Sequence, residues 1–344
     1  MAAEHDAEMA WPSADQLGEG PVWDDKRRLL YRVDLAAGAV LSLDLGTGTE
    51  RRYEIGCPVG CVALRDDGDG LILGLPDGFG RLDLDDGTVS RLATLTHDTA
   101  LMQLNDGGCD PAGRFYAGSI SRDASPGTGT LYRYQPPDAV RALMTGIGVS
   151  NGMTWDSVGT TFFFVDSLER RVDRFRYDPA RGTLADRRPA FDVSRFEGIP
   201  DGIEIDAEDC LWVTFWRGGA VRRFTASGRL LDEVRLPVRR ATSCCLGGPR
   251  LSTLFITTAR RSLRAVGDPE PLGGAIFALA VDTPGVARAP VATRRRQLTR
   301  WTTYGYPPRS RPGSAPPCHV PAGPGRPGTW RRVTPPTRSR AAHA

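Results

Sequence analysis

The stretch PDGIEIDAEDCLWVTFW (200–216) is one of six variants of a single pattern, and that pattern predicts the fold. In this stretch an anchor residue, Asp201, is followed five positions later by Asp206 and then by an apolar, strand-like run. The six anchors are Glu19, Cys61, Asn105, Asn151, Asp201 and Ser243, and their +5 partners are Asp24, Asp66, Asp110, Asp156, Asp206 and Gly248. Successive anchors lie 42 to 50 residues apart, and such a period indicates a repeat fold.

Each unit also contains further short apolar segments separated by turn residues. After Asp201 these segments are CLWVTFW (210–216), GAVRRF (219–224) and LLDEVRL (230–236). Groups of three or four such strands, repeated along the chain, are typical of propeller blades. We therefore predict an all-β, six-bladed β-propeller over residues 15–282. The sixth unit has no obvious outer segment, so residues 1–14 are a candidate closing strand, although their strand propensity is poor.

The last part of the chain differs sharply in composition from the rest. After Asp282 there is no Asp or Glu, whereas 12 of the 44 Lys and Arg residues follow it, so residues 1–282 carry 32 basic and 41 acidic residues. Residues 283–344 show no apolar alternation, and we predict a disordered basic tail. Two interpretations remain open: a nucleic-acid-binding or membrane-binding arm, and an out-of-frame C-terminus, which we favour. The acidic body argues against nucleic acid as the main partner.

Cysteine usage and hydropathy bear on the cellular environment. The seven cysteines form no CxxC pair and no Cys/His zinc pattern. The N-terminus does not resemble a signal peptide, and no apolar run approaches the length of a membrane span. We therefore expect a cytoplasmic protein without a membrane partner. The sequence leaves the oligomeric state open.

The anchors carry the chemistry of the repeat. In a propeller they would precede the innermost strands and ring one mouth of the central channel, where Glu19 and Asp201 supply carboxylates and Asn105 and Asn151 supply amides. Such oxygen ligands favour Ca²⁺, Mg²⁺ or Mn²⁺, although Zn²⁺ or Fe²⁺ can also occupy these sites. An Asn-Gly or Asp-Gly pair alone would more often indicate a turn. The +5 aspartates have that structural interpretation, as caps of the hairpin after each inner strand.

Several motifs resemble those of the regucalcin/gluconolactonase family. They are LGEGPVWD (17–24), NDGGCDPAGRFYAGS (105–119), SNGMTWD (150–156), GIPDGIEIDAEDCLWV (198–213) and TSCCLGGPRLSTLFITTA (242–259). The resemblance covers about residues 15–282 and includes the main motifs of the family in order. It implies a six-bladed propeller that binds one divalent metal ion and hydrolyses sugar lactones.

The resemblance also implies roles for individual residues. By position, the metal ligands are Glu19, Asn151 and Asp201, and the lactone-binding Asn of the family falls on Asn105. The family often has Arg two residues earlier, where this chain has Gln103, and a substrate-contacting Glu of the family falls on Asp123. We expect Asn105, Asp123 and Gln103 to bind substrate. The absence of the Arg removes a forked, charged donor, which bears on the choice of substrate more than on lactone hydrolysis itself.

The function expected is metal-dependent hydrolysis of an aldonolactone to its hydroxy acid, with a small-molecule lactone as partner. The metal would act as Lewis acid and Asp201 as general base. Two other hypotheses of function remain open. One is a non-catalytic Ca²⁺-binding or ligand-binding propeller, and the other is an interaction scaffold whose metal site has decayed. A histidine-dependent lactonase is disfavoured because all four histidines lie outside the anchors, and Ser150 and Ser243 lack the GxSxG elbow of a serine hydrolase.

Overall fold

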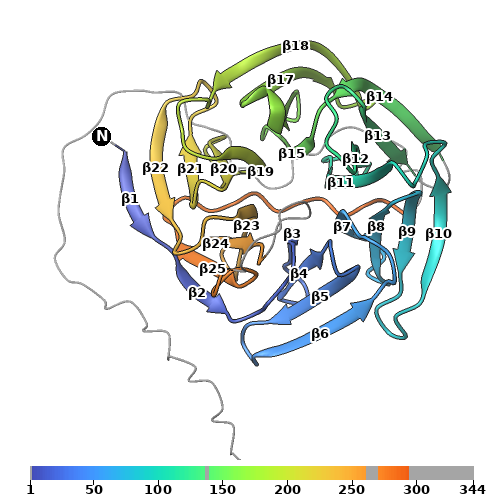
Figure 1. The fold of residues 1–344 in the computed structure, drawn as a ribbon, viewed down its shortest axis with the longest axis horizontal. Coiled ribbons are helices and arrows are strands. Elements are labelled where there is room, and N and C mark those ends of the chain that lie inside the picture. Colours follow the sequence, from blue (N-terminus) through green and yellow to red (C-terminus); the bar gives the residue numbers. More distant parts are fainter. Residues whose placement is uncertain (1, 136–138, 261–269, 294–344) are drawn as a thin grey trace, which may run out of the picture. The chain divides into compact units, whose positions relative to one another are not determined.

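The computed structural model describes residues 2–135, 139–260 and 270–293, all within the unit that ends at Leu298. These residues form six sheets arranged as blades around a central channel (Figure 1), which confirms the six-bladed β-propeller. Apart from the short 3₁₀ turn η1 (Ser167–Glu169), the regular elements in the described ranges are strands. None of the described elements is a helix long and apolar enough to cross a membrane.

The first three blades follow one another along the chain, each with its innermost strand first. Blade 1 comprises β3 (Gly18–Asp24), β4 (Leu29–Asp34), β5 (Ala39–Asp44) and β6 (Thr49–Glu54). Blade 2 comprises β7 (Cys61–Leu64), β8 (Leu71–Leu75), β9 (Gly78–Leu82) and β10 (Val89–Thr94). Blade 3 comprises β11 (Met102–Cys109), β12 (Phe115–Ser121), β13 (Gly129–Gln135) and β14 (Ala139–Ile147).

The last two blades each include a strand from the N-terminus, whereas blade 4 does not. Blade 4 comprises β15 (Ser150–Trp155), β16 (Thr161–Asp166), β17 (Arg171–Asp178) and β18 (Thr183–Asp192). Blade 5 comprises β19 (Ile199–Ile205), β20 (Leu211–Trp216), β21 (Ala220–Phe224) and β22 (Leu230–Arg235), and β1 (Ala3–Asp6) extends it in parallel to β22. Blade 6 comprises β23 (Ala241–Gly247), β24 (Thr253–Thr258), β25 (Ile276–Ala280) and, as its outer strand, β2 (Glu8–Trp11).

The ring closes through β2 and the segment that follows it. β2 pairs antiparallel with β25, with Met9 opposite Phe277, and this outer place in blade 6 is the one expected of a closing strand. The strand propensity of residues 8–11 is poor, but β25 offers an unpaired edge that requires a partner for its backbone groups. Blade 6 therefore contains strands from both ends of the propeller sequence.

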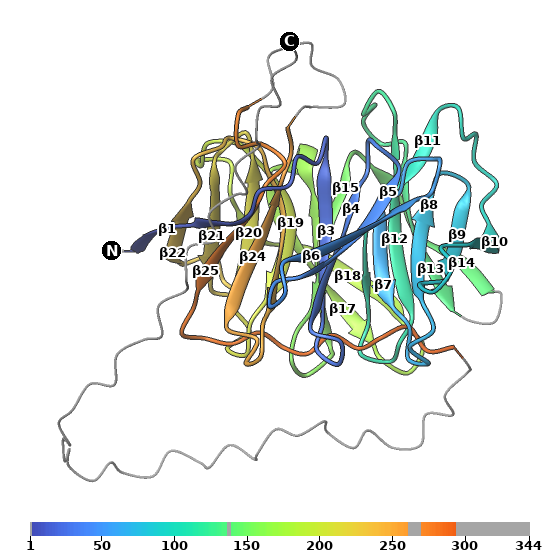
Figure 2. The same ribbon diagram turned by 90° about the horizontal axis from the view of Figure 1, so that it is seen from below.

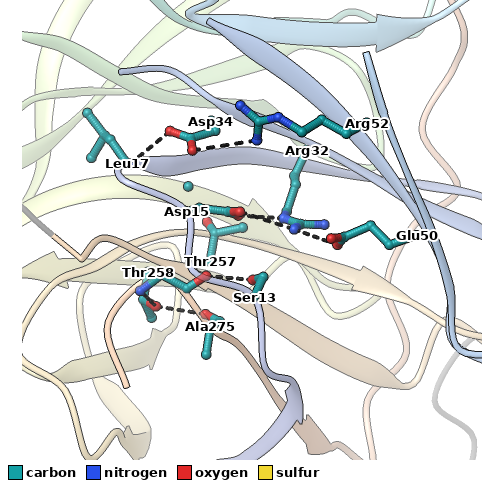
Figure 3. A network of polar contacts seen from close by, with 12 residues as sticks. Ser13, Asp15, Leu17, Arg32, Asp34, Glu50, Arg52, Thr257, Thr258 and Ala275 are labelled. Atoms are coloured by element: carbon teal, nitrogen blue, oxygen red, sulfur yellow. Dashed lines mark hydrogen bonds and ion pairs between the residues drawn. The ribbon is translucent and has the colours of Figure 1, made fainter. Parts of the chain in front are cut away.

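A buried polar network lies at this closure (Figure 3). Arg32 on β4 is fully buried, and its Nε and Nη2 donate to Asp15 at 2.6 and 3.2 Å. Its Nη2 also donates to Glu50 of β6 at 2.7 Å. The backbone of Asp15 bonds to blade 6, donating to the carbonyl of Gly274 and accepting from Arg260. Because Asp15 contacts both blades, its ion pair with Arg32 ties blade 1 to blade 6.

Apolar side chains fill the spaces between neighbouring blades. One such core joins Phe163 and Val165 of blade 4 to Ile203 and Val213 of blade 5. The strands are short and rich in branched or aromatic residues, which pack well on a twisted sheet surface. The channel in the middle is bordered by the six inner strands.

The pairing of five inner strands is interrupted near the anchors. The register shifts between Glu19 and Val22 in β3, and equivalent shifts occur in β11, β15, β19 and β23. A bulge frees residues from the ladder and turns their side chains away from the regular alternation. The Asn-Gly and Asp-Gly pairs at positions 151–152 and 201–202 are therefore bulges within strands rather than turns.

Close packing between neighbouring inner strands explains why a glycine follows each of these two anchors. A Cβ on Gly152 would lie 2.5 Å from the backbone N of Ile203, and one on Gly202 would lie 2.6 Å from the Cα of Ser243. Neighbouring inner strands approach so closely at the bulges that only glycine fits. The Asx-Gly pattern in the sequence thus reflects the close packing of strands around the channel.

The expected boundary of the tail at residue 282 is wrong by about ten residues. Residues 283–293, which we call the strap, run along the end of the propeller where the inner strands finish (Figure 2). Gly285 bridges to Asp206, Val291 bridges to Arg65, and Val291 is fully buried. The strap has no apolar alternation because it crosses the blades instead of joining a sheet. The rest of the predicted tail, residues 294–344, lies outside the described residues.

Candidate functional site

The anchors gather at one mouth of the channel, near the starts of the inner strands. The sequence pattern predicted that each anchor precedes its inner strand, and this detail is wrong, because each anchor lies within that strand. Two of the expected ligands, Glu19 and Asp201, are 182 positions apart in the sequence, yet the charge of Asp201 contributes to a raised pKa of Glu19. The propeller therefore brings together the polar anchors of distant repeats.

A chain of hydrogen bonds orients the amide anchors. The Nδ2 of Asn105 donates to Asn151 Oδ1 at 2.7 Å and to the Ser150 carbonyl at 2.9 Å. The Nδ2 of Asn151 donates at 2.7 Å to the hydroxyl of Ser167, which in turn donates to the Pro200 carbonyl at 2.6 Å. Because Ser167 holds the amide nitrogen of Asn151, the amide oxygen of Asn151 points toward Asn105, the neighbouring anchor. Ser167 lies in η1, and sequence reasoning did not single it out.

Burial and neighbouring charges disfavour the ionised forms of three carboxylates near the mouth. Burial, followed by the charges of Asp201 and Asp106, raises the pKa of Glu19 well above its usual value. Burial and the charge of Asp106 likewise raise the pKa of Asp201 well above its usual value. Burial raises the pKa of Asp106 to about 6, although the Gly107 N–H and the charge of Arg288 oppose that rise. The protein thus places these three acidic side chains close to one another, and the positive charge near them is too small to balance their negative charges.

This donor set fits a hard divalent cation. Glu19 and Asp201 supply carboxylate oxygens, and Asn151 supplies an amide oxygen that Ser167 orients. The mutual repulsion of the acids is the condition that a bound cation would relieve. In the described ranges no three His, Cys, Asp or Glu side chains are arranged to hold a metal by themselves.

The raised pKa of Asp106 leads to a prediction about stability. The folded pKa, about 6, exceeds the usual value of 3.8, so the proton on Asp106 favours folding below about pH 4. This contribution is lost as the pH rises through about 6. We expect Asp106→Asn, in protein stripped of metal with a chelator, to increase the free energy of unfolding at pH 7.5 by about 3 kcal/mol. The gain should disappear near about pH 3.5, and urea unfolding at both pH values measures it. A variant no more stable than the native chain at pH 7.5 contradicts the prediction.

Below the mouth, the channel contains a small cavity. Its volume is about 10 Å³, which is enough for about one water molecule. Residues from all six inner strands line it, including Asp106 and Ser243, and Arg288 of the strap lines it as well. Sequence reasoning missed both charged residues. Asp106 stands beside Asn105 in the quoted NDGG motif and could have been found there, whereas Arg288 was assigned to the tail.

The other two expected substrate residues do not line the cavity. Gln103 is on β11, but its side chain is buried and does not line the cavity. Asp123 is exposed in the loop after β12, where its carboxylate accepts from the backbone N of Ser125 at 3.0 Å and from its hydroxyl at 2.7 Å. Hydrogen bonds from Ser125 lower the pKa of Asp123 to about 2. Among the described residues, no hydrogen bond joins the side chain of Gln103 or Asp123 to an anchor.

The remaining anchors and the +5 residues have structural places. Asp110 caps the hairpin after β11 by accepting from Ala112 and Arg114, as expected. Asp66 differs, because its carboxylate accepts from the backbone and the hydroxyl of Thr293 on the strap. Cys61 is buried, and burial raises the pKa of its thiol well above the usual value, as suits a small core residue.

Comparisons with known proteins point to one family. The model of the SMP-30/gluconolactonase/LRE-like region matches residues 17–260. Regucalcin of Gallus gallus is 36% identical over 269 residues, covering 76% of this chain and 90% of its own. Regucalcin of Homo sapiens is 36% identical over 281 residues, covering 78% of this chain and 92% of its own.

Solved structures agree with the fold. A calcium-binding protein, regucalcin from Agrobacterium tumefaciens, has a TM-score of 0.79 at 24% identity and covers 85% of this chain and 99% of its own. A luciferin-regenerating enzyme has a TM-score of 0.77 at 26% identity and covers 81% of this chain and 96% of its own. A gluconolactonase from Xanthomonas campestris has a TM-score of 0.63 at 21% identity, with coverage of 80% and 89%.

Proposed function

Because the chain belongs to the SMP-30/gluconolactonase/LRE-like family, we propose that it is a lactonase that hydrolyses a sugar lactone at the mouth of the channel. The family supports a role of the lactone-hydrolase kind in general. The observation that supports the particular site is the convergence of Glu19, Asn151 and Asp201, with Asn105 bonded to Asn151 at 2.7 Å. These residues come from four different blades, and each belongs to the inner strand of its blade.

These ring residues would have different roles in hydrolysis. Glu19, Asn151 and Asp201 would hold one divalent ion, which when bound polarises the lactone carbonyl and stabilises negative charge on its oxygen. Both hydrogens of the Asn105 amide nitrogen are engaged by Asn151 and by the Ser150 carbonyl, so Asn105 would contact the substrate through its amide oxygen, accept from a substrate hydroxyl and orient the ring. Asp201 would accept a proton from the water that attacks the carbonyl carbon. The C–O bond of the ring then breaks, and the proton passes to the leaving alkoxide to give the hydroxy acid.

Acid release tests this proposal directly. The chain, stripped of metal with a chelator, is mixed with an aldonolactone in a pH-stat, and Mn²⁺, Zn²⁺ or Ca²⁺ is then added. We expect acid release above the spontaneous rate only with metal, and loss of that rate when the chelator is restored. Absence of metal-dependent hydrolysis for every aldonolactone tried, with metal binding intact by calorimetry, contradicts the proposed activity.

A second candidate is a non-catalytic metal-binding propeller. It is favoured by the calcium-binding description of the regucalcin from Agrobacterium tumefaciens, which shares this fold. The same ring would hold the ion without turning over a substrate. The two candidates differ in one measurement, since both predict metal binding and only the lactonase predicts acid release.

A further inference from the structure

The strap crosses the channel end opposite the proposed site. Near its start, the backbone N of Ala207 in blade 5 donates to Pro284 at 2.9 Å. Near its end, Val291 bonds to Leu64 of blade 2 and Ala292 to Gly113 of blade 3. The strap thus passes from one side of the ring to the other, and its path across the centre is visible in Figure 1.

Arg288, midway along the strap, reaches into the channel. Its Nε and Nη2 donate to Glu204 Oε2 at 3.1 and 2.7 Å, and the Glu204 side chain is only 5% exposed. Among the described side chains that line the cavity, Arg288 is the only base and Asp106 is the only carboxylic acid. The positively charged guanidinium of Arg288, on the strap, therefore lies in the channel below the proposed metal site.

Glu204 connects this ion pair to the mouth. It lies on β19 three residues after Asp201, so at about 3.3 Å per residue the two carboxylates are separated by roughly 10 Å along the strand. At that range, inside a protein, a unit charge still acts appreciably on a divalent ion. An ionised Glu204 without its partner would add negative charge to a site that is already crowded with acids.

We propose that Arg288 is a positioning residue which, by pairing with Glu204, sets the charge of the lower channel and thereby the affinity of the mouth for a divalent cation. The strap is then part of the functional unit and not merely a connection to the tail. This inference rests on the proposed metal site but not on lactone turnover. The charge of Arg288 also lowers the pKa of Asp106, which agrees with its reach into the channel.

Charge-changing variants of the full chain make the proposal testable, because the two single substitutions should act in opposite directions. Arg288→Met leaves the Glu204 carboxylate unbalanced and should tighten Mn²⁺ binding. Glu204→Gln leaves the guanidinium unbalanced and should weaken it. Each shift should be on the order of tenfold in Kd at pH 8 and low ionic strength. The double variant is neutral like the native pair and should bind Mn²⁺ about as the native chain does.

Titration calorimetry with Mn²⁺ alone provides the measurement. Arg288→Lys keeps the charge and should bind like the native chain. Arg222→Met removes an arginine paired with Glu233 in the outer part of blade 5 and should lower stability without changing the Kd. If thermal unfolding shows that Arg288→Met does not fold, the weaker binding of Glu204→Gln and its recovery in the double variant decide the question.

The outcomes separate this inference from the proposal on which it rests. If the native chain binds neither Mn²⁺ nor Ca²⁺ nor Zn²⁺, the metal site itself is wrong. If the native chain binds Mn²⁺ but both single variants weaken binding alike, or all variants agree within about twofold, the inference about Arg288 is overturned while the metal site stands. A purely structural role for the ion pair predicts weakening in both single variants.

Discussion

Asp201→Asn is expected to lower lactone turnover by about 10³-fold at saturating metal. The amide has nearly the same shape as the carboxylate but cannot accept a proton from water at neutral pH. Asp201 also loses its negative charge toward the cation, so the variant should need more metal than the native chain. Its buried place beside Glu19 makes both effects large, because solvent cannot replace the missing charge.

A control for this variant exists in the neighbouring repeat. Asp156 occupies the +5 position after Asn151, and its carboxylate accepts from the backbone N of Thr160 and Thr161 at the other end of blade 4. Asp156→Asn makes the same chemical change and should leave kcat near the native value. Turnover is compared by pH-stat across a metal titration. If saturating metal restores the full kcat of Asp201→Asn, the residue is a ligand only, and its role as base is excluded.

Arg32→Met is expected to lower the free energy of unfolding by about 3–5 kcal/mol. The substitution leaves the carboxylate of Asp15, which is 3% exposed, without its bidentate partner in the seam between blades 1 and 6. An unpaired buried charge is more costly than the loss of a contact, because water cannot reach it. For a chain of this size the midpoint of thermal unfolding should fall by roughly 10 °C.

An exposed ion pair gives the matched comparison. Arg235 pairs with Glu4 and Asp6 between β22 and β1, and its side chain is 51% exposed. Arg235→Met should cost less than about 1 kcal/mol, because solvent screens the pair. Urea unfolding of both variants measures the difference. If Arg32→Met is as stable as Arg235→Met, the buried network does not hold the ring closed.

The fold was accessible from the sequence because the propeller repeats a local pattern. An anchor such as Asp201, a +5 residue such as Asp206 and the apolar run after it recur at a nearly constant period, and each blade is formed by neighbouring segments. The same reasoning did not predict that the strap packs on the propeller. Val291 is fully buried without belonging to any alternating strand, so no periodic signal marks it.

The site was accessible only in part. Glu19, Asn105, Asn151 and Asp201 occupy equivalent positions of a repeat, so the periodicity places them at one mouth. Their partners do not repeat. Ser167 orients Asn151 from a 3₁₀ turn. Gln103 is buried and Asp123 bonds to Ser125 in an exposed loop, and neither lines the cavity.

The sequence by itself determined the six blades, the inner strands and the ring of polar anchors, because the spacing of residues within one repeat decides which strands pair. Only the tertiary structure decided the charge balance of the channel. Arg288 and Glu204 are 84 positions apart and belong to no common repeat, yet they pair at 2.7 Å because the strap crosses the ring. Electrostatic balance depends on distances in space. Because the Arg288–Glu204 pair does not recur from repeat to repeat, no periodic pattern along the sequence predicts it.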